Sequence, residues 1–179
     1  MSIHTHIAVL EVAGKLRRYV PKSRYSPKRR LYLTEKAVKD LESPDSVINL
    51  LAIRGQVEEG LKRWVSGGRV WVDLQGKPRF LKPLCPPPSE TPPEIWELRF
   101  TDPRVQARLF LRFAEPDTII GTKFHTRKLL GDRGSPEWKA AFRECETSWN
   151  ELFPGFTPFS GKTIHDYVTE NCDDFPLCS

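Results

Sequence analysis

Three segments in the second half of the chain alternate large apolar and polar residues with a period of two, which is typical of β-strands. They cover residues 95–100, 107–113 and 118–128. If the three strands pair as a meander, alternate positions form one apolar face. The positions assigned to that face are Trp96, Leu98, Phe100, Leu109, Leu111, Phe113, Ile120, Thr122 and Phe124.

The opposite face of this meander would carry a group of cations. They are Arg99, Arg108, Arg112, Lys123 and His125. An apolar face needs a cover of helices, whereas a basic face suits an anion such as phosphate. The same pattern is also compatible with a solvated exterior whose cations pair across strands with acids such as Glu97.

Residues 135–152 give the clearest helix signal. Ser135 is a good N-cap, and Pro136 suits the first helical position. Apolar residues then recur at helical spacing, at Trp138, Ala141, Phe142, Cys145, Trp149 and Leu152. These aromatic residues, and Cys145, are expected to be core.

Two further helices are predicted in the first half of the chain. Thr34 would cap a short helix that follows a strand at residues 30–33. A second helix is expected at residues 46–65, in which Gly55 and Gly60 weaken the helical tendency. These two helices are the candidates for covering the apolar face of the sheet. The short apolar run Ile7–Val12 is interpreted as an edge strand.

Together these elements predict an α+β fold, with a small antiparallel-rich sheet and helices packed on one face. The domain would span residues 30–153 and contain a proline-rich insert at 86–93, where regular helix is excluded. A basic N-terminal extension, 1–29, and a C-terminal extension, 154–179, would flank it.

The 179-residue chain has a formal net charge of +5, which fits a polyanionic partner. No apolar run approaches membrane-spanning length and the N-terminus lacks a signal-peptide pattern, so we expect a cytoplasmic protein without a membrane partner. The four cysteines form no C-x-x-C pair. We therefore expect no zinc site, and no other metal or cofactor.

Residues 15–30 contain eight basic residues and no acid, with Tyr19 and Tyr25 among them. One interpretation is a phosphate-binding arm, because lysine and arginine neutralise backbone charge and tyrosine stacks on bases. Its RNA contacts would come from Arg17, Arg18, Arg29 and Arg30. The other interpretation is a solvated, poorly ordered extension.

The order of these elements resembles the RelE/ParE toxin superfamily, in particular its phage-derived and HigB-like branch. The matching motifs are Glu97-Leu98-Arg99, a central Arg108, Phe124 followed by Arg127 and Lys128, and Pro136 with Ala141. The resemblance covers about residues 30–150. The chain departs from the branch in its HTRK sequence after position 124, where paired lysines are usual, and in its greater length.

This resemblance implies an mRNA interferase, a metal-independent endoribonuclease that cleaves mRNA on the ribosome and is neutralised by a cognate antitoxin. The expected partners are therefore mRNA, the ribosome and that antitoxin. The candidate catalytic residues are Arg108, Arg99, His125 and Lys128. The candidate RNA-binding residues on the same face are Arg112, Lys123 and Arg127.

The chemistry of these side chains fits the role. Arginine binds phosphate oxygens through a bidentate fork, and histidine titrates near neutral pH and can act as acid or base. Tyr167 or His165 of the tail would be further candidates. The alternative is a non-catalytic protein of the same fold, which inhibits a topoisomerase or binds nucleic acid or a host protein for a phage. A competent acid and base near Arg108 would favour the nuclease, and a basic face with neither would favour this alternative.

Overall fold

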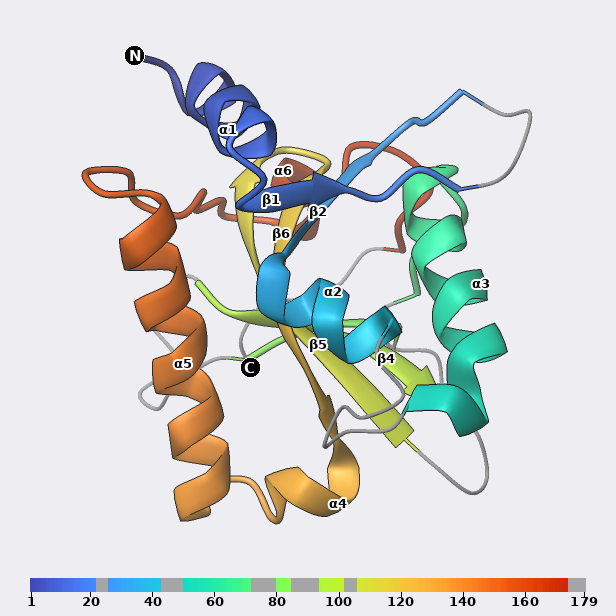
Figure 1. Ribbon diagram of the computed structural model, residues 1–179. Helices are drawn as coiled ribbons and strands as arrows, with labels where there is room; N and C mark the ends of the chain where they lie inside the picture. Colours follow the sequence, from blue (N-terminus) through green and yellow to red (C-terminus); the bar gives the residue numbers. More distant parts are fainter. Residues whose placement is uncertain (22–25, 43–49, 72–79, 85–93, 102–105, 174–179) are drawn as a thin grey trace.

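A computed structural model gives the fold of the chain (Figure 1). The structure describes residues 1–21, 26–42, 50–71, 80–84, 94–101 and 106–173. The proline-rich insert 86–93 and the first part of the helix predicted at 46–65 lie outside these residues.

Six strands of the described residues form one mixed sheet, in the order β1-β2-β6-β5-β4-β3. Their bounds are β1 Leu16–Arg18, β2 Arg30–Thr34, β3 Leu81–Pro83, β4 Trp96–Thr101, β5 Gln106–Glu115 and β6 Thr118–Thr126. β2 runs parallel to β6, and the other neighbouring strands are antiparallel. The α+β class with a mainly antiparallel sheet is therefore confirmed.

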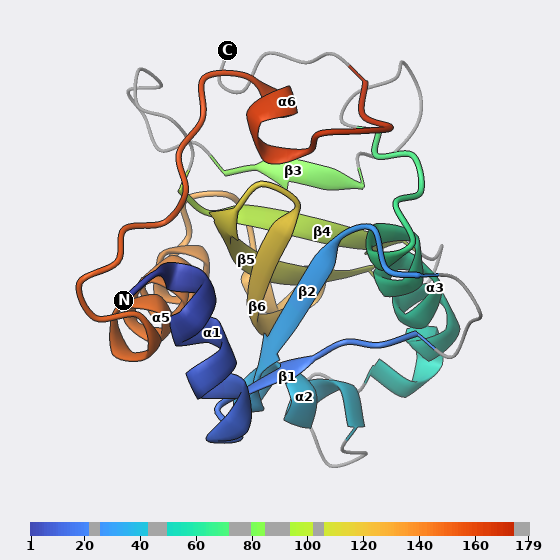
Figure 2. The ribbon, with the colours of Figure 1, turned by 90° about the horizontal axis from the view of Figure 1, so that it is seen from above.

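Helices cover both faces of this sheet, so the prediction of helices on one face only is wrong (Figures 1 and 2). Their bounds are α1 Ile3–Val12, α2 Glu35–Glu42, α3 Arg54–Val65, α4 Arg127–Leu130, α5 Pro136–Leu152 and α6 Ile164–Tyr167. A 3-10 turn, η1 at Leu50–Ile53, leads into α3. The apolar stripe of α5 must also be buried. Because α2, α3 and α6 occupy one face of the sheet, α5 packs on the other face.

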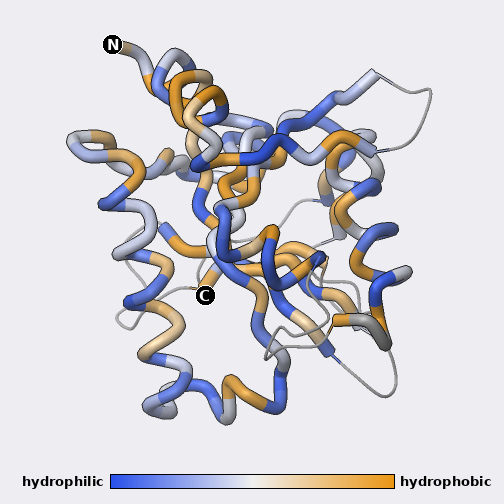
Figure 3. The backbone as a smooth tube through the Cα atoms, viewed as in Figure 1, coloured by the Kyte–Doolittle hydropathy of each residue, from blue (hydrophilic) through white to orange (hydrophobic). Residues whose placement is uncertain are grey.

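The larger core lies between α2, α3, α6 and the face of the sheet that carries the alternating apolar residues. At its centre, the ring of Phe113 lies 6.0 Å from that of Trp64 on α3 and 5.3 Å from that of Trp96 on β4. Figure 3 shows hydrophobic and hydrophilic positions alternating along α3 and α5, as expected of helices with one face on a sheet.

The face assignment of the third strand is correct at Phe124 but wrong at Ile120. The register of β5 and β6 shifts by one between Phe110 and Leu111, so that Thr122 is an extra residue in β6. Such a β-bulge reverses the inward–outward alternation of the positions beyond it. Phe124 therefore belongs to the larger core, whereas Ile120 packs on the other face with Trp149 of α5.

The first helix was missed by the sequence reasoning. The apolar run expected to be an edge strand is part of α1, where the hydroxyl of Ser2 caps the backbone amide of Thr5. Ile7 and Leu10 lie three positions apart and are both buried. Residues three apart share a face of a helix and lie on opposite faces of a strand.

The predicted caps of α2 and α5 are confirmed. The Thr34 hydroxyl accepts a hydrogen bond from the amide of Ala37, and the Ser135 hydroxyl accepts one from the amide of Trp138. α5 then runs from Pro136, and its bounds match the predicted ones. Cys145 is buried as predicted, and burial raises the pKa of its thiol to about 11.

Gly60 lets α3 approach the sheet more closely than any side chain would allow. A Cβ atom at this position would lie 2.6 Å from Cε1 of Phe100, whereas one at Gly55 would have nothing within 4 Å. Replacing glycine by alanine raises the helix propensity by a similar amount at both positions. We therefore expect Gly60→Ala to be less stable than Gly55→Ala by about 1–3 kcal/mol, the usual cost of overpacking. Urea unfolding measures the difference, and equal stabilities would contradict the close approach.

Candidate functional site

Three of the predicted site residues lie side by side across the sheet. Arg99 on β4 is the register partner of Arg108 on β5, and Arg108 is the register partner of His125 on β6. Directly opposed residues of antiparallel strands point to the same face and are close neighbours. We call Arg99, Arg108 and His125 the cationic row. Strand alternation placed them on one face, and the registers bring them together.

A buried carboxylate neutralises part of the charge in this row. Glu97 is fully buried, and its Oε1 accepts hydrogen bonds from Nε of Arg99, at 2.8 Å, and from Nη1 of Arg108. The Arg108 guanidinium also lies 5.9 Å from the ring of Trp138 on α5. The pairing with Glu97 therefore matches the alternative interpretation of the basic face. The face is not a solvated exterior, however, because α5 covers it.

The cationic row reaches the surface at the ends of β4 and β5. A depression of about 200 Å³ lies there, lined by Arg99, Thr101, Gln106, Ala107 and Arg108. The Arg99 side chain keeps 22% of its surface exposed, whereas that of Arg108 keeps 9%. Arg99 is therefore the cation that an anion in the depression would meet first, with Arg108 behind it.

His125 is half-buried at the far end of the row, with its ring centroid 4.8 Å from that of Phe110. Burial, with the charge of Lys123 adding to it, lowers the pKa of His125 from 6.5 to about 4. The imidazole is therefore neutral at physiological pH. A neutral imidazole can accept a proton, which suits the role of base better than that of acid.

Two other cations of this face, which are not members of the row, form ion pairs with acids. Arg112 is 4% exposed and pairs with Glu94 at 3.2 Å and with Glu146 of α5 at 4.0 Å. Lys123 pairs with Glu144 of α5 at 3.1 Å. These acids of α5 lie over the basic side of the sheet, so both contacts tie the helix to the sheet.

The cations of α4 lie at the surface directly after β6. Arg127 is partly exposed and forms an ion pair with Asp132 at 3.4 Å. Lys128 is exposed. Both follow His125 closely in the chain, so they border the His125 end of the row.

The described parts of the N-terminal basic segment, residues 15–21 and 26–30, contain β1 and lead into β2. Arg29 is 2% exposed, pairs with Asp117 at 3.4 Å and donates to the carbonyl oxygens of Gly68 and Glu170. It is therefore a structural cation, and its assignment to RNA binding is corrected.

The other arginines of this segment differ in exposure. Arg17 pairs with Glu42, Arg30 pairs with Glu115 at 3.0 Å, and Arg18 is exposed on β1. They belong to the β1–β2 edge of the sheet, whereas the cationic row crosses β4, β5 and β6.

The tail residue Tyr167 does not take part in the row. Tyr167 is fully buried in the larger core, where its ring packs on those of Trp96 and Phe113. These residues lie on the sheet face opposite the row, so Tyr167 cannot reach it. His165 is exposed on α6.

Sequence reasoning missed three neighbours of the row. Thr101 and Gln106 line the depression, and Trp138 lies beside Arg108. The helical spacing of α5 identified Trp138 as core. Only the packing of α5 shows that its ring meets a guanidinium.

Comparison with known proteins finds no matching family model, curated protein or solved structure. Among the described residues, no group of three or more histidine, cysteine, aspartate or glutamate residues is placed to hold a metal ion. In the same part of the chain, none of the helices has the length and apolar character needed to span a membrane.

Proposed function

We propose that the protein is an endoribonuclease that binds an RNA phosphodiester at the cationic row and cleaves it. The observation that supports the proposal is the register of Arg108 with Arg99 on one side and with His125 on the other, which gives Arg108 a second arginine and a neutral imidazole as its neighbours across the sheet. Guanidinium groups stabilise the charge that develops on a phosphorane, and an imidazole removes a proton from a hydroxyl group.

The proposed reaction is a transphosphorylation. His125 accepts the proton of the ribose 2′-hydroxyl, and the 2′-oxygen attacks the adjacent phosphorus atom. Arg99 and Arg108 stabilise the additional negative charge on the phosphate oxygens. The bond to the 5′-oxygen breaks, and that oxygen takes a proton from solvent. The products are a 2′,3′-cyclic phosphate and a 5′-hydroxyl end.

The partners proposed for this reaction come from the resemblance to RelE/ParE toxins, supported by the same order of strand, helices, meander and final helix in the fold. They are mRNA, the translating ribosome and a cognate antitoxin protein. Arg127 and Lys128 lie next to the row in the chain and would contact the RNA backbone.

A second candidate function is binding without cleavage, and Glu97 is the observation that favours it. Its buried carboxylate bonds to both arginines of the row. One carboxylate shared by two guanidinium groups leaves a single net positive charge, which is sufficient to bind a phosphate but weakens stabilisation of a dianionic transition state. This single positive charge would be sufficient for a protein of the same fold that only binds nucleic acid or a host protein.

A cleavage assay on a defined mRNA, free and in a cell-free translation reaction, separates these functions. We expect His125→Asn to lower the cleavage rate by about 10²–10⁴-fold, the usual contribution of a general base. Arg99→Ala should lower it by about 10²–10³-fold, as for loss of one donor to a developing charge. Both residues are partly exposed, so the variants should fold. Primer extension and end analysis would identify the 5′-hydroxyl product.

Lys139→Ala is the control, because Lys139 is exposed on α5, outside the row and its depression. It should cleave at the wild-type rate. If the wild-type protein binds RNA and leaves it intact, the second candidate function replaces the first. If His125→Asn cleaves as fast as the wild type, the assigned base is wrong.

A further inference from the structure

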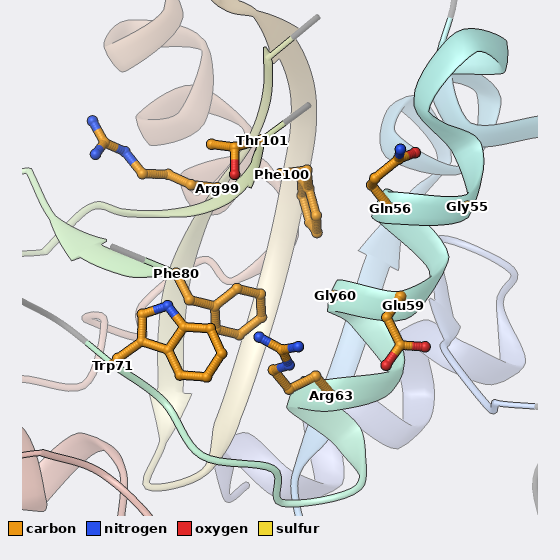
Figure 4. Close-up of a pocket in the computed structure, with 10 residues that line it drawn as sticks. All are labelled: Gly55, Gln56, Glu59, Gly60, Arg63, Trp71, Phe80, Arg99, Phe100 and Thr101. Carbon is orange, nitrogen blue, oxygen red and sulfur yellow. The ribbon is translucent and has the colours of Figure 1, made fainter. Parts of the chain in front are cut away.

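A second cavity, of about 480 Å³, lies between α3 and the end of β4 (Figure 4). The residues that give it its chemistry are Gln56, Glu59, Arg63, Trp71, Phe80 and Phe100. Figure 4 shows the side chains of α3 on one side and the aromatic residues on the other. The cavity therefore combines flat apolar surfaces with hydrogen-bonding groups.

The flat surface is formed by a stack of side chains. The guanidinium of Arg63 lies 4.4 Å from the ring centroid of Trp71 and 5.8 Å from that of Phe80. Phe80 and Phe100 are buried, whereas Trp71 and Arg63 remain partly exposed. Aromatic rings and arginine planes are the surfaces on which unpaired nucleic-acid bases stack.

The hydrogen-bonding groups stand along one face of α3. Gln56, Glu59 and Arg63 are spaced by three and four residues, so they start from the same side of the helix, and the Arg63 side chain extends toward the aromatic residues (Figure 4). Between them Gly60 has no side chain, which brings the helix close to Phe100 and leaves the polar groups on either side. Glu59 is exposed, and it offers a carboxylate on the helix side of the cavity, across from the aromatic residues.

This cavity adjoins the depression at the cationic row. Arg99 and Thr101 line both of them. In Figure 4 the Arg99 side chain points away from the aromatic residues, with Thr101 between it and Phe100. A phosphate at Arg99 and a base beside Phe80 and Trp71 would therefore lie on the two sides of the end of β4.

We propose that this cavity binds an unpaired guanine base of the RNA whose phosphate occupies the cationic row. The base stacks on the Arg63–Trp71 pair, and its N1–H and N2–H groups donate to the Glu59 carboxylate. Adenine lacks that pair of donors on its Watson–Crick edge, so Glu59 selects guanine. The proposal rests on the proposed function, because it takes the ligand to be RNA.

Intrinsic fluorescence tests the proposal with guanosine monophosphate as the probe. Trp71 is the most exposed of the five tryptophans, all of which lie in the described residues. Stacking should quench it. We expect guanosine monophosphate to quench the wild type more strongly than adenosine, cytidine or uridine monophosphate does, and to leave Trp71→Phe unquenched.

Glu59→Gln and Glu58→Gln form a matched pair for the base preference. The two residues are neighbours on α3 and both are exposed, but only Glu59 lines the cavity. Glu59→Gln should weaken binding of guanosine monophosphate about tenfold, the effect of losing a hydrogen bond to a charged acceptor. It should leave adenosine monophosphate binding unchanged, and Glu58→Gln should behave as the wild type.

Equal binding of the four nucleotides, or equal effects of the two substitutions, would overturn the base site. Cleavage of RNA by the same protein in that case would leave the proposed function in place. Conversely, guanine-selective quenching by a protein that does not cleave RNA would support the base site and contradict the proposed nuclease function.

Binding of labelled single-stranded RNA, measured by fluorescence polarisation, should weaken about tenfold in Trp71→Ala, because one stacked base is lost. Circular dichroism checks that each variant is folded.

Discussion

Replacing Glu97 by alanine is expected to lower the free energy of unfolding by about 3–5 kcal/mol, the usual cost of removing one partner of a buried ion pair. Glu97 is fully buried and bonds to Arg99 and Arg108. Without it, the Arg108 guanidinium would remain buried beside Trp138 with no counter-ion from β4. Urea unfolding at neutral pH measures the loss.

Two further substitutions separate charge from volume. Glu97→Gln keeps the size of the side chain and removes its charge, so it should be nearly as destabilising as Glu97→Ala. Glu58→Ala removes the acid of an exposed ion pair with Arg54, at 2.9 Å, and should change the stability by less than about 1 kcal/mol. A loss of similar size in Glu97→Ala and Glu58→Ala would show that the buried pair contributes no more than an exposed one.

Acidification is expected to destabilise the protein through His125 by up to about 3 kcal/mol, the free energy that corresponds to the difference between its two pKa values. The pKa falls from 6.5 to about 4 in the folded protein, so protons bind more tightly to the unfolded chain. The contribution of His125 to stability is therefore complete above pH 6.5 and is lost as the pH falls toward 4. Urea unfolding at several pH values between 6.5 and 4 measures this loss of stability.

His125→Asn is the control, because asparagine does not titrate. The groups that face His125 are its register partner Arg108, Lys123 and Glu144, and the two cations oppose its protonation. The variant should show a flatter stability profile than the wild type between pH 6.5 and 4. Parallel profiles would show that folding leaves the pKa of His125 unchanged, so that His125 does not contribute to the pH dependence of stability.

These two predictions concern opposite ends of one site. Glu97 holds Arg99 and Arg108 in place from β4, and burial keeps His125 uncharged on β6. If both are correct, the row is preorganised, with its guanidinium groups fixed and its imidazole neutral before any RNA arrives. Preorganised charges and dipoles are the main source of electrostatic stabilisation in enzymes.

The elements with a strong local pattern could be predicted from the sequence. The meander of β4, β5 and β6 follows from the alternation of apolar and polar residues, which the bulge in β6 interrupts, and α5 follows from its serine cap, proline start and helical stripe. The common face of Arg99, Arg108 and His125 follows from the same alternation. Side chains of one strand take their direction from the backbone, so local sequence is sufficient.

Features that depend on distant partners could not be predicted. The bulge at Thr122 moved Ile120 to the other face, and the run that becomes α1 was too short to separate helix from strand. Arg29 lies in a basic segment that resembles a solvated arm. Its burial depends on Asp117 and on the carbonyl of Glu170, far along the chain.

The sequence by itself determined which residues form the strands of the meander, which residues form α5, and which cations share a face. Only the tertiary structure decided what covers that face and how the cations are paired. α5 lies over it and brings Glu144 and Glu146 to Lys123 and Arg112, while Glu97 bonds to the arginines of the row. The physical reason is that periodicity fixes the direction of a side chain, whereas its charge partner is fixed by packing between segments distant in sequence.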